Sequence, residues 1–146
     1  MLIKNLDTDP NCLTERPCFN CRTMKDSQTG KIRYIPPSEN DTYSIQIAPH
    51  TVPAGAIIII NYQTVNKATP AYPDNIKTLS NNGWMLTVQA LREDTCIIKF
   101  QGNNVLLREV TVFSSLDDYN NFQQYNLLSL KADIMPLINL QVGGVA

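Results

Sequence analysis

The sequence predicts an all-β protein: an antiparallel β-sandwich of immunoglobulin-like or jelly-roll-like type, with an extended N-terminal arm and a short C-terminal helix. Three observations support this class. Apolar and polar residues alternate over 42–47 and again over 84–90, the period-two pattern of a half-buried strand. Four consecutive isoleucines lie within 56–62, and their branched Cβ atoms favour a strand buried on both faces. Short turn signals such as Asn81-Asn82-Gly83 separate the segments, as in an antiparallel meander.

The 146 residues have the usual size of one domain, and their composition divides them into three regions. Residues 1–40 are polar, hold four prolines and three cysteines, and are expected to form an irregular arm with at most a short hairpin at 31–35. Residues 41–115 carry the strongest strand patterns and are expected to form the sandwich. Residues 116–146 are expected to supply the helix and a last strand that pack on the sandwich or extend from it.

Within the sandwich, strands are expected at 43–47, 56–62, 84–90, 95–101 and 105–113. The stretch 63–80 shows no clear period and is expected to be a long surface loop, or a loop with one short edge strand. Trp84 is expected to anchor the core. The expected core residues are Ile45, Ile47, Ile58, Ile60, Trp84, Leu86, Val88, Ile98, Val110 and Val112.

A helix of about three turns is predicted after Ser115, whose spacing to Asp118 is similar to a capping box. Leu116, Tyr119, Phe122 and Tyr125 then recur at every third position. Two interpretations stay open for these aromatic side chains. They pack the helix onto the sandwich, or they form an exposed docking element, since tyrosine and phenylalanine are typical of interface cores.

The charge pattern argues against nucleic acid and membrane as partners. The net charge is −1, and the twelve basic residues are scattered rather than gathered into the positive stripe that phosphate binding needs. No apolar run approaches the roughly 20 residues of a spanning helix. The opening residues do not resemble a signal peptide, so we expect a chain made in the cytoplasm.

The cysteines offer the only candidate metal ligands with a suitable spacing. Cys18-Phe19-Asn20-Cys21 has the two-residue gap of a zinc knuckle, and Cys12 and His50 would complete a site. The overall spacing fits no standard zinc module. Unpaired thiols are therefore the favoured interpretation, a disulfide stays open, and no metal or cofactor is expected.

No catalytic set is visible, and the chain is not expected to be an enzyme. His50 is the single histidine and lies between two predicted strands, where the polarity of a turn explains it. The acidic pairs at 93–94 and 117–118 are adjacent in sequence, which does not hold two carboxylates at a catalytic distance. The glycines form no phosphate-binding loop.

Two functions from different classes remain. The first is a structural protein, an accessory virion component such as a phage capsid decoration, fibre or tail protein, that assembles with other protein subunits as a homo- or hetero-oligomer and ends up in the particle. Its docking side chains would be Phe19, Tyr34, Tyr119, Phe122 and Tyr125. The alternative is a carbohydrate- or ligand-binding β-sandwich module, in which Trp84, Tyr62 and Tyr72 could stack on sugar faces.

Overall fold

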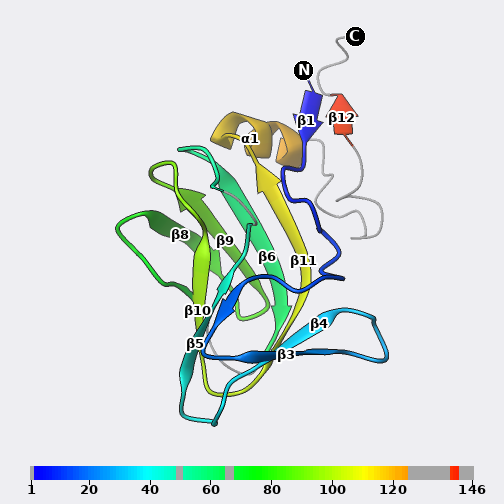
Figure 1. Cartoon of the computed structure of the whole chain (residues 1–146). Helices are drawn as coiled ribbons and strands as arrows, with labels where there is room; N and C mark the ends of the chain where they lie inside the picture. Colours follow the sequence, from blue (N-terminus) through cyan, green and yellow to red (C-terminus); the bar gives the residue numbers. More distant parts are fainter. Residues whose placement is uncertain (1, 49–50, 65–67, 125–138, 142–146) are drawn as a thin grey trace.

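Two antiparallel sheets form a sandwich in the computed structural model, which describes residues 2–48, 51–64, 68–124 and 139–141 (Figure 1). The large sheet has the spatial order β3 (Arg22–Lys25), β4 (Ile32–Ile35), β11 (Val105–Phe113), β6 (Ile57–Gln63), β9 (Met85–Ala90), β8 (Ile76–Asn81). The small sheet has the order β2 (Cys18–Phe19), β5 (Thr42–Gln46), β10 (Ile97–Gln101), β7 (Thr69–Pro70). The predicted fold class is confirmed.

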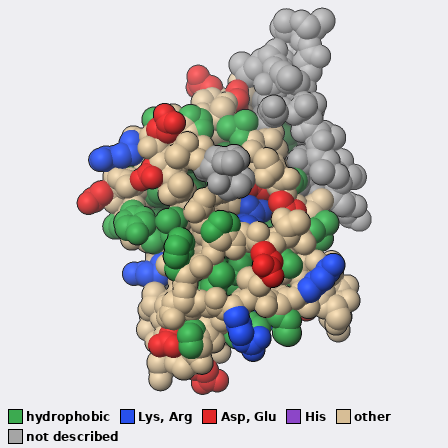
Figure 2. All heavy atoms as spheres, viewed as in Figure 1, with side chains coloured by type: hydrophobic (Ala, Val, Ile, Leu, Met, Phe, Trp, Pro, Cys, Tyr) green, Lys and Arg blue, Asp and Glu red, His purple; other side chains and the backbone are tan. Residues whose placement is uncertain are grey.

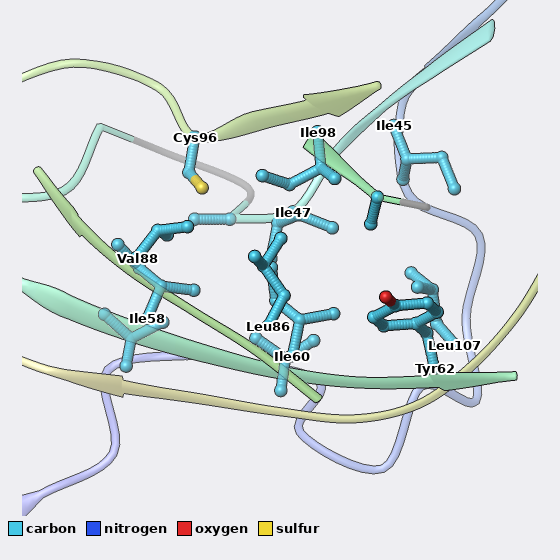
Figure 3. Packing of buried hydrophobic residues seen from close by; sticks show 14 of the residues in the cluster. Ile45, Ile47, Ile58, Ile60, Tyr62, Leu86, Val88, Cys96, Ile98 and Leu107 are labelled. Atoms are coloured by element: carbon cyan, nitrogen blue, oxygen red, sulfur yellow. The ribbon is translucent and has the colours of Figure 1, made fainter. Parts of the chain in front are cut away.

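The core lies between the two sheets and is built from alternate residues of each strand. Figure 3 shows Ile45, Ile47 and Ile98 on the side of the small sheet, pointing toward isoleucine, leucine and valine side chains of β6 and β9. Nine of the ten expected core residues are buried; they are Ile45, Ile47, Ile58, Ile60, Leu86, Val88, Ile98, Val110 and Val112. The period-two patterns therefore identified the inward face correctly.

Trp84 is the tenth expected core residue, and its placement in the core was wrong. It keeps 58% of its surface exposed. The physical reason is that Trp84 belongs to the turn before β9. The Asn82 Oδ1 atom accepts hydrogen bonds from the backbone N–H of Trp84 at 3.2 Å and of Met85 at 2.9 Å. These bonds keep Trp84 in the turn, and the strand begins only at Met85.

Residues 1–40, predicted as an irregular arm, supply strands to both sheets and side chains to the core. Strand β2 pairs with β5, and the β3–β4 hairpin extends the large sheet through β11. Tyr34 is 1% exposed. A buried ion pair joins Arg16 to Asp7 at 2.9 Å, and Arg16 also donates to the backbone oxygen of Ile47. The region looked too polar for a core because two of its charged residues, Arg16 and Asp7, are buried as an ion pair.

The predicted edge strand in 63–80 is present as the six-residue β8, with the two-residue β7 before it. The predicted helix is α1 (Leu116–Gln124), and the Ser115 Oγ atom accepts a hydrogen bond from the Asp118 N–H at 3.1 Å.

Strand β1 (Leu2–Lys4) pairs with β12 (Asn139–Gln141). Among the described residues, no helix combines the length and apolarity needed to cross a bilayer.

Candidate ligand-binding groove

The outer face of the large sheet carries its own ordered set of side chains. Successive residues of a strand point to opposite faces of the sheet. The residues that alternate with the core residues along each strand therefore lie on the outer face. One cross-strand row runs from Glu109 on β11 through Asn61 on β6 to Met85 on β9. The next row contains Thr111, Ile59, Thr87 and Ser80. The outer face therefore combines polar side chains with the apolar side chains of Met85 and Ile59.

Helix α1 covers one end of this face and leaves the middle open (Figure 1). Phe113, the last residue of β11, packs against Tyr119 and Phe122 with ring centroids 5.7 and 5.1 Å apart. Between α1 and the Trp84 turn lies a groove of about 460 Å³, lined by both rows of strand residues, Trp84, Tyr119 and Gln123. We call this the central groove. Its volume lies in the range of small-ligand sites, roughly 300–1,000 Å³.

Bulges in two strands shape the groove. In β11 the register shifts between Leu107 and Glu109, so that Arg108 is the additional residue of the strand. In β8 a second shift lies between Thr78 and Ser80. A bulge bends its strand and redirects the neighbouring side chains. Leu107 accordingly stays buried in the core, whereas Glu109 lines the groove.

Asn61 and Glu109 form the polar centre of the groove. The Asn61 Nδ2 atom donates a hydrogen bond to Glu109 Oε1. Within the described residues, the buried Asn61 Oδ1 and Glu109 Oε2 atoms have no hydrogen-bond partner. Burial raises the pKa of Glu109, and the bond from Asn61 and the positive charges of Lys31 and Arg108 act in the opposite direction. Two acceptors without donors in the protein are an unusual feature of a buried site.

Trp84 separates the central groove from a second cavity of about 540 Å³, which we call the side cavity. Trp84, Asn61 and Glu109 line both spaces. Arg108 lies on the side cavity only.

The five docking residues predicted from the sequence do not gather at one site. Phe19 is exposed on β2 of the small sheet, whereas Tyr34 and Phe122 are buried at 1% and 4% exposure and are not open to a partner. Tyr119 is half-buried and lines the central groove. Tyr125 lies outside the described residues.

Of the three aromatic residues named for the alternative function, only Trp84 lines the central groove. Tyr62 is buried, and its hydroxyl donates to Asn81 Oδ1 at 3.0 Å. Tyr72 is 56% exposed and lies outside the lining of the groove. Asn61 and Glu109 were not predicted as site residues. The available signal was a single amide directly after the four isoleucines of 57–60 and a charged pair inside the apolar segment 105–113.

The cysteines are free thiols, two of them buried (Cys12, Cys96) and two half-buried (Cys18, Cys21). No group of three or more histidine, cysteine, aspartate or glutamate side chains that could hold a metal lies within the described part of the chain. His50, the fourth ligand considered from the sequence, lies outside that part. Figure 2 shows acidic and basic side chains interspersed over the face in view, without a block of one sign.

No family model and no curated protein matches this sequence. Solved structures of carbohydrate-binding modules of family 29 are similar to it. A variant complexed with cellulohexaose is 14% identical and covers 81% of this chain and 94% of its own, with a TM-score of 0.42. A second variant is 15% identical and covers 87% and 97%, with a TM-score of 0.41, and a further module of the family is 16% identical over 81% and 92%, also with 0.41.

These comparisons correct the first function and the partners predicted from the sequence. The matched structures are carbohydrate-binding modules, not phage or virion components, and their ligands are carbohydrates rather than protein subunits of an assembly. A likeness at this identity describes the sandwich and assigns no ligand to this chain. The ligand has to be argued from the groove itself.

Proposed function

We propose that this chain is a non-catalytic carbohydrate-binding module that holds a sugar in the central groove. The observation that supports the proposal is one constellation: an exposed indole, Trp84, beside two buried acceptors, Asn61 Oδ1 and Glu109 Oε2, that lack donors within the described residues. Carbohydrate binding is the alternative function that the sequence suggested through Trp84, Tyr62 and Tyr72, of which Trp84 lines the groove.

The chemistry of a pyranose matches such a site. A sugar ring presents apolar C–H groups on its face and hydroxyls at its edge. An exposed indole offers a flat apolar surface on which the C–H groups of the sugar can pack. A carboxylate and an amide oxygen accept hydrogen bonds from the sugar hydroxyls. Hydrogen bonds to an ionised carboxylate are roughly twice as strong as neutral ones.

The position of the acceptors on central strands favours recognition without rearrangement. Asn61 and Glu109 lie opposite each other on β6 and β11, whose inward residues are fully buried in the core. Groups on rigid strands lose little freedom on binding, which improves affinity.

The lining of the central groove also favours binding over hydrolysis. Glycosidases canonically use two carboxyl groups at a set separation across the scissile bond. Glu109 is the single acidic residue among the described residues that line the groove.

The test is a glycan array followed by calorimetric titration of any hit. Trp84→Ala should weaken binding about tenfold or more, because tenfold corresponds to only 1.4 kcal/mol of lost contact. Tyr72→Ala, which removes a similarly exposed aromatic ring outside the groove, should bind as wild type. Both variants should unfold within about 0.5 kcal/mol of wild type, since neither ring is in the core. Equal affinity of Trp84→Ala and wild type would contradict the proposal.

A further inference from the structure

We propose that the sugar bound in the central groove carries a protonated amine, so that the ligand class is an oligomer of amino sugars. This inference rests on the proposed function and narrows it. The juxtaposition behind it is a carboxylate oxygen and an amide oxygen, both buried and without donors within the described residues, in a groove that Trp84 and Tyr119 also line.

The orientation of the Asn61 amide is fixed by its neighbour. Its Nδ2 atom donates to Glu109 Oε1, and a flipped amide would instead place two oxygens against each other. Oδ1 is therefore the atom left without a partner, and Glu109 Oε2 is the second. Within the described residues, these two buried oxygens are acceptors that no donor of the protein reaches. A hydroxyl has one proton to donate, whereas an ammonium group has three.

The charge at Glu109 is also unpaired. Among the described residues, the ion pairs are Arg16–Asp7 and Arg33–Asp26, and neither involves Glu109. Lys31 Nζ donates to the backbone oxygens of Asn11 and Arg108, both at 2.7 Å, and Arg108 lines the side cavity rather than the central groove. The half-buried Glu109 carboxylate thus has an amide partner in Asn61 but no ion pair, and a ligand cation would supply the missing charge.

The walls of the groove suit a cation as well. Trp84 and Tyr119 lie in the lining with Glu109, and an ammonium group near an aromatic face gains about 0.5–2 kcal/mol. An acetylated amine has lost this charge and two of its protons. An acidic sugar would bring its carboxylate against Glu109. Both alternatives fit the groove less well than the free amine.

The test compares three oligosaccharides of equal length on the wild-type chain by calorimetry: glucosamine hexamer, its N-acetylated form and the glucose hexamer. The pH is set low enough to protonate the amine and high enough, above the raised pKa of Glu109, to keep the carboxylate ionised. Glucosamine hexamer should bind about tenfold tighter than either, which is 1.4 kcal/mol. Glu109→Gln should abolish this preference while weak binding of the neutral oligomers persists. Glu93→Gln removes an exposed carboxylate outside the groove and should leave the preference intact, which separates the site from general attraction to acidic groups.

The outcomes distinguish this inference from the proposed function. If a neutral oligomer binds as tightly as the amino sugar and Trp84→Ala weakens this binding, the inference of an amino-sugar ligand is wrong. The proposed carbohydrate binding in the central groove is then still supported. If none of the three oligomers binds, the amino-sugar inference is overturned, and if the glycan array also gives no hit, carbohydrate binding is overturned as well. The comparison of the three ligands on the wild-type chain needs no variant, so a folding defect of Glu109→Gln does not remove the test.

Discussion

Cys96 and Cys12 illustrate how burial sets the chemistry of single residues. Burial raises the pKa of the Cys96 thiol to about 12, and that of Cys12 to about 11 although the Arg16 guanidinium opposes the shift. A thiolate in either place would lose its hydration without a sufficient partner. These cysteines are core residues of small volume, in agreement with the favoured interpretation of the sequence as unpaired thiols.

The raised pKa values predict a loss of stability in alkali. In the unfolded chain both thiols ionise above their ordinary pKa of 9.0, whereas the folded chain keeps them protonated up to about 11 and 12. The unfolded state therefore binds fewer protons in this window, and the free energy of unfolding should fall as the pH rises from about 9. Urea unfolding across this range measures the slope, and Cys96→Ala should reduce it. A slope unchanged in that variant would contradict the assignment to Cys96.

At the scale of elements, the turn between β8 and β9 determines where Trp84 points. Gly83 has φ +91°, a conformation that side chains disfavour, and a Cβ built there would meet no atom within 4 Å. Any loss of stability on substitution of Gly83 therefore comes from the strained backbone conformation and not from a steric clash of the side chain. The turn was predicted from Asn81-Asn82-Gly83, but its consequence for Trp84 was not, because the capping by Asn82 is a three-dimensional feature.

Gly83→Ala should lower both stability and affinity. The strained backbone costs about 1–2 kcal/mol, and its relaxation should shift the indole that follows. Gly55→Ala provides a matched control, since Gly55 has φ +88°, also has open space around it, and lies outside the central groove. Denaturant unfolding should show a similar loss for both variants, and calorimetry a loss of affinity for Gly83→Ala alone. Equal affinities would mean that the turn does not position Trp84.

The strands that the sequence predicted well are those with one buried and one outer face or with both faces buried, such as β5 and β6. Strand β8 gave no clear period because it is an edge strand with a bulge, and four of its six residues are exposed. Trp84 was noticed as an aromatic ligand-binding candidate but placed in the core. The pairing of Asn61 with Glu109 could not be predicted, because it depends on the register of β6 against β11 across the Arg108 bulge.

At the scale of the whole molecule, the N-terminal region belongs to the sandwich. Residues 1–35 include β2, β3 and β4, the buried Tyr34 and the Arg16–Asp7 ion pair. The sequence predicted an irregular arm here, beside a sandwich formed by residues 41–115, so that a chain without residues 1–35 would stay folded. The structure leads to the opposite expectation, because their loss opens one edge of each sheet and uncovers part of the core.

Deletion of residues 1–35 should therefore unfold the chain or cause it to aggregate, which circular dichroism and size-exclusion chromatography would detect. Deletion of residues 1–4 is the matched control. It removes β1, which pairs with β12 in the described structure, and it should leave the two main sheets folded. A cooperative thermal transition in the longer deletion would contradict the expectation.

The two acceptors of the central groove have a consequence for the evolution of the chain. Each buried polar atom without a partner destabilises the ligand-free protein by about 1–3 kcal/mol, and Ile59 and Met85, which line the same groove, show that apolar side chains are tolerated on this face. A laboratory selection for heat resistance alone would thus favour apolar replacements of Asn61 and Glu109. The selected variants would be more stable, but their groove would have lost its specificity for a ligand.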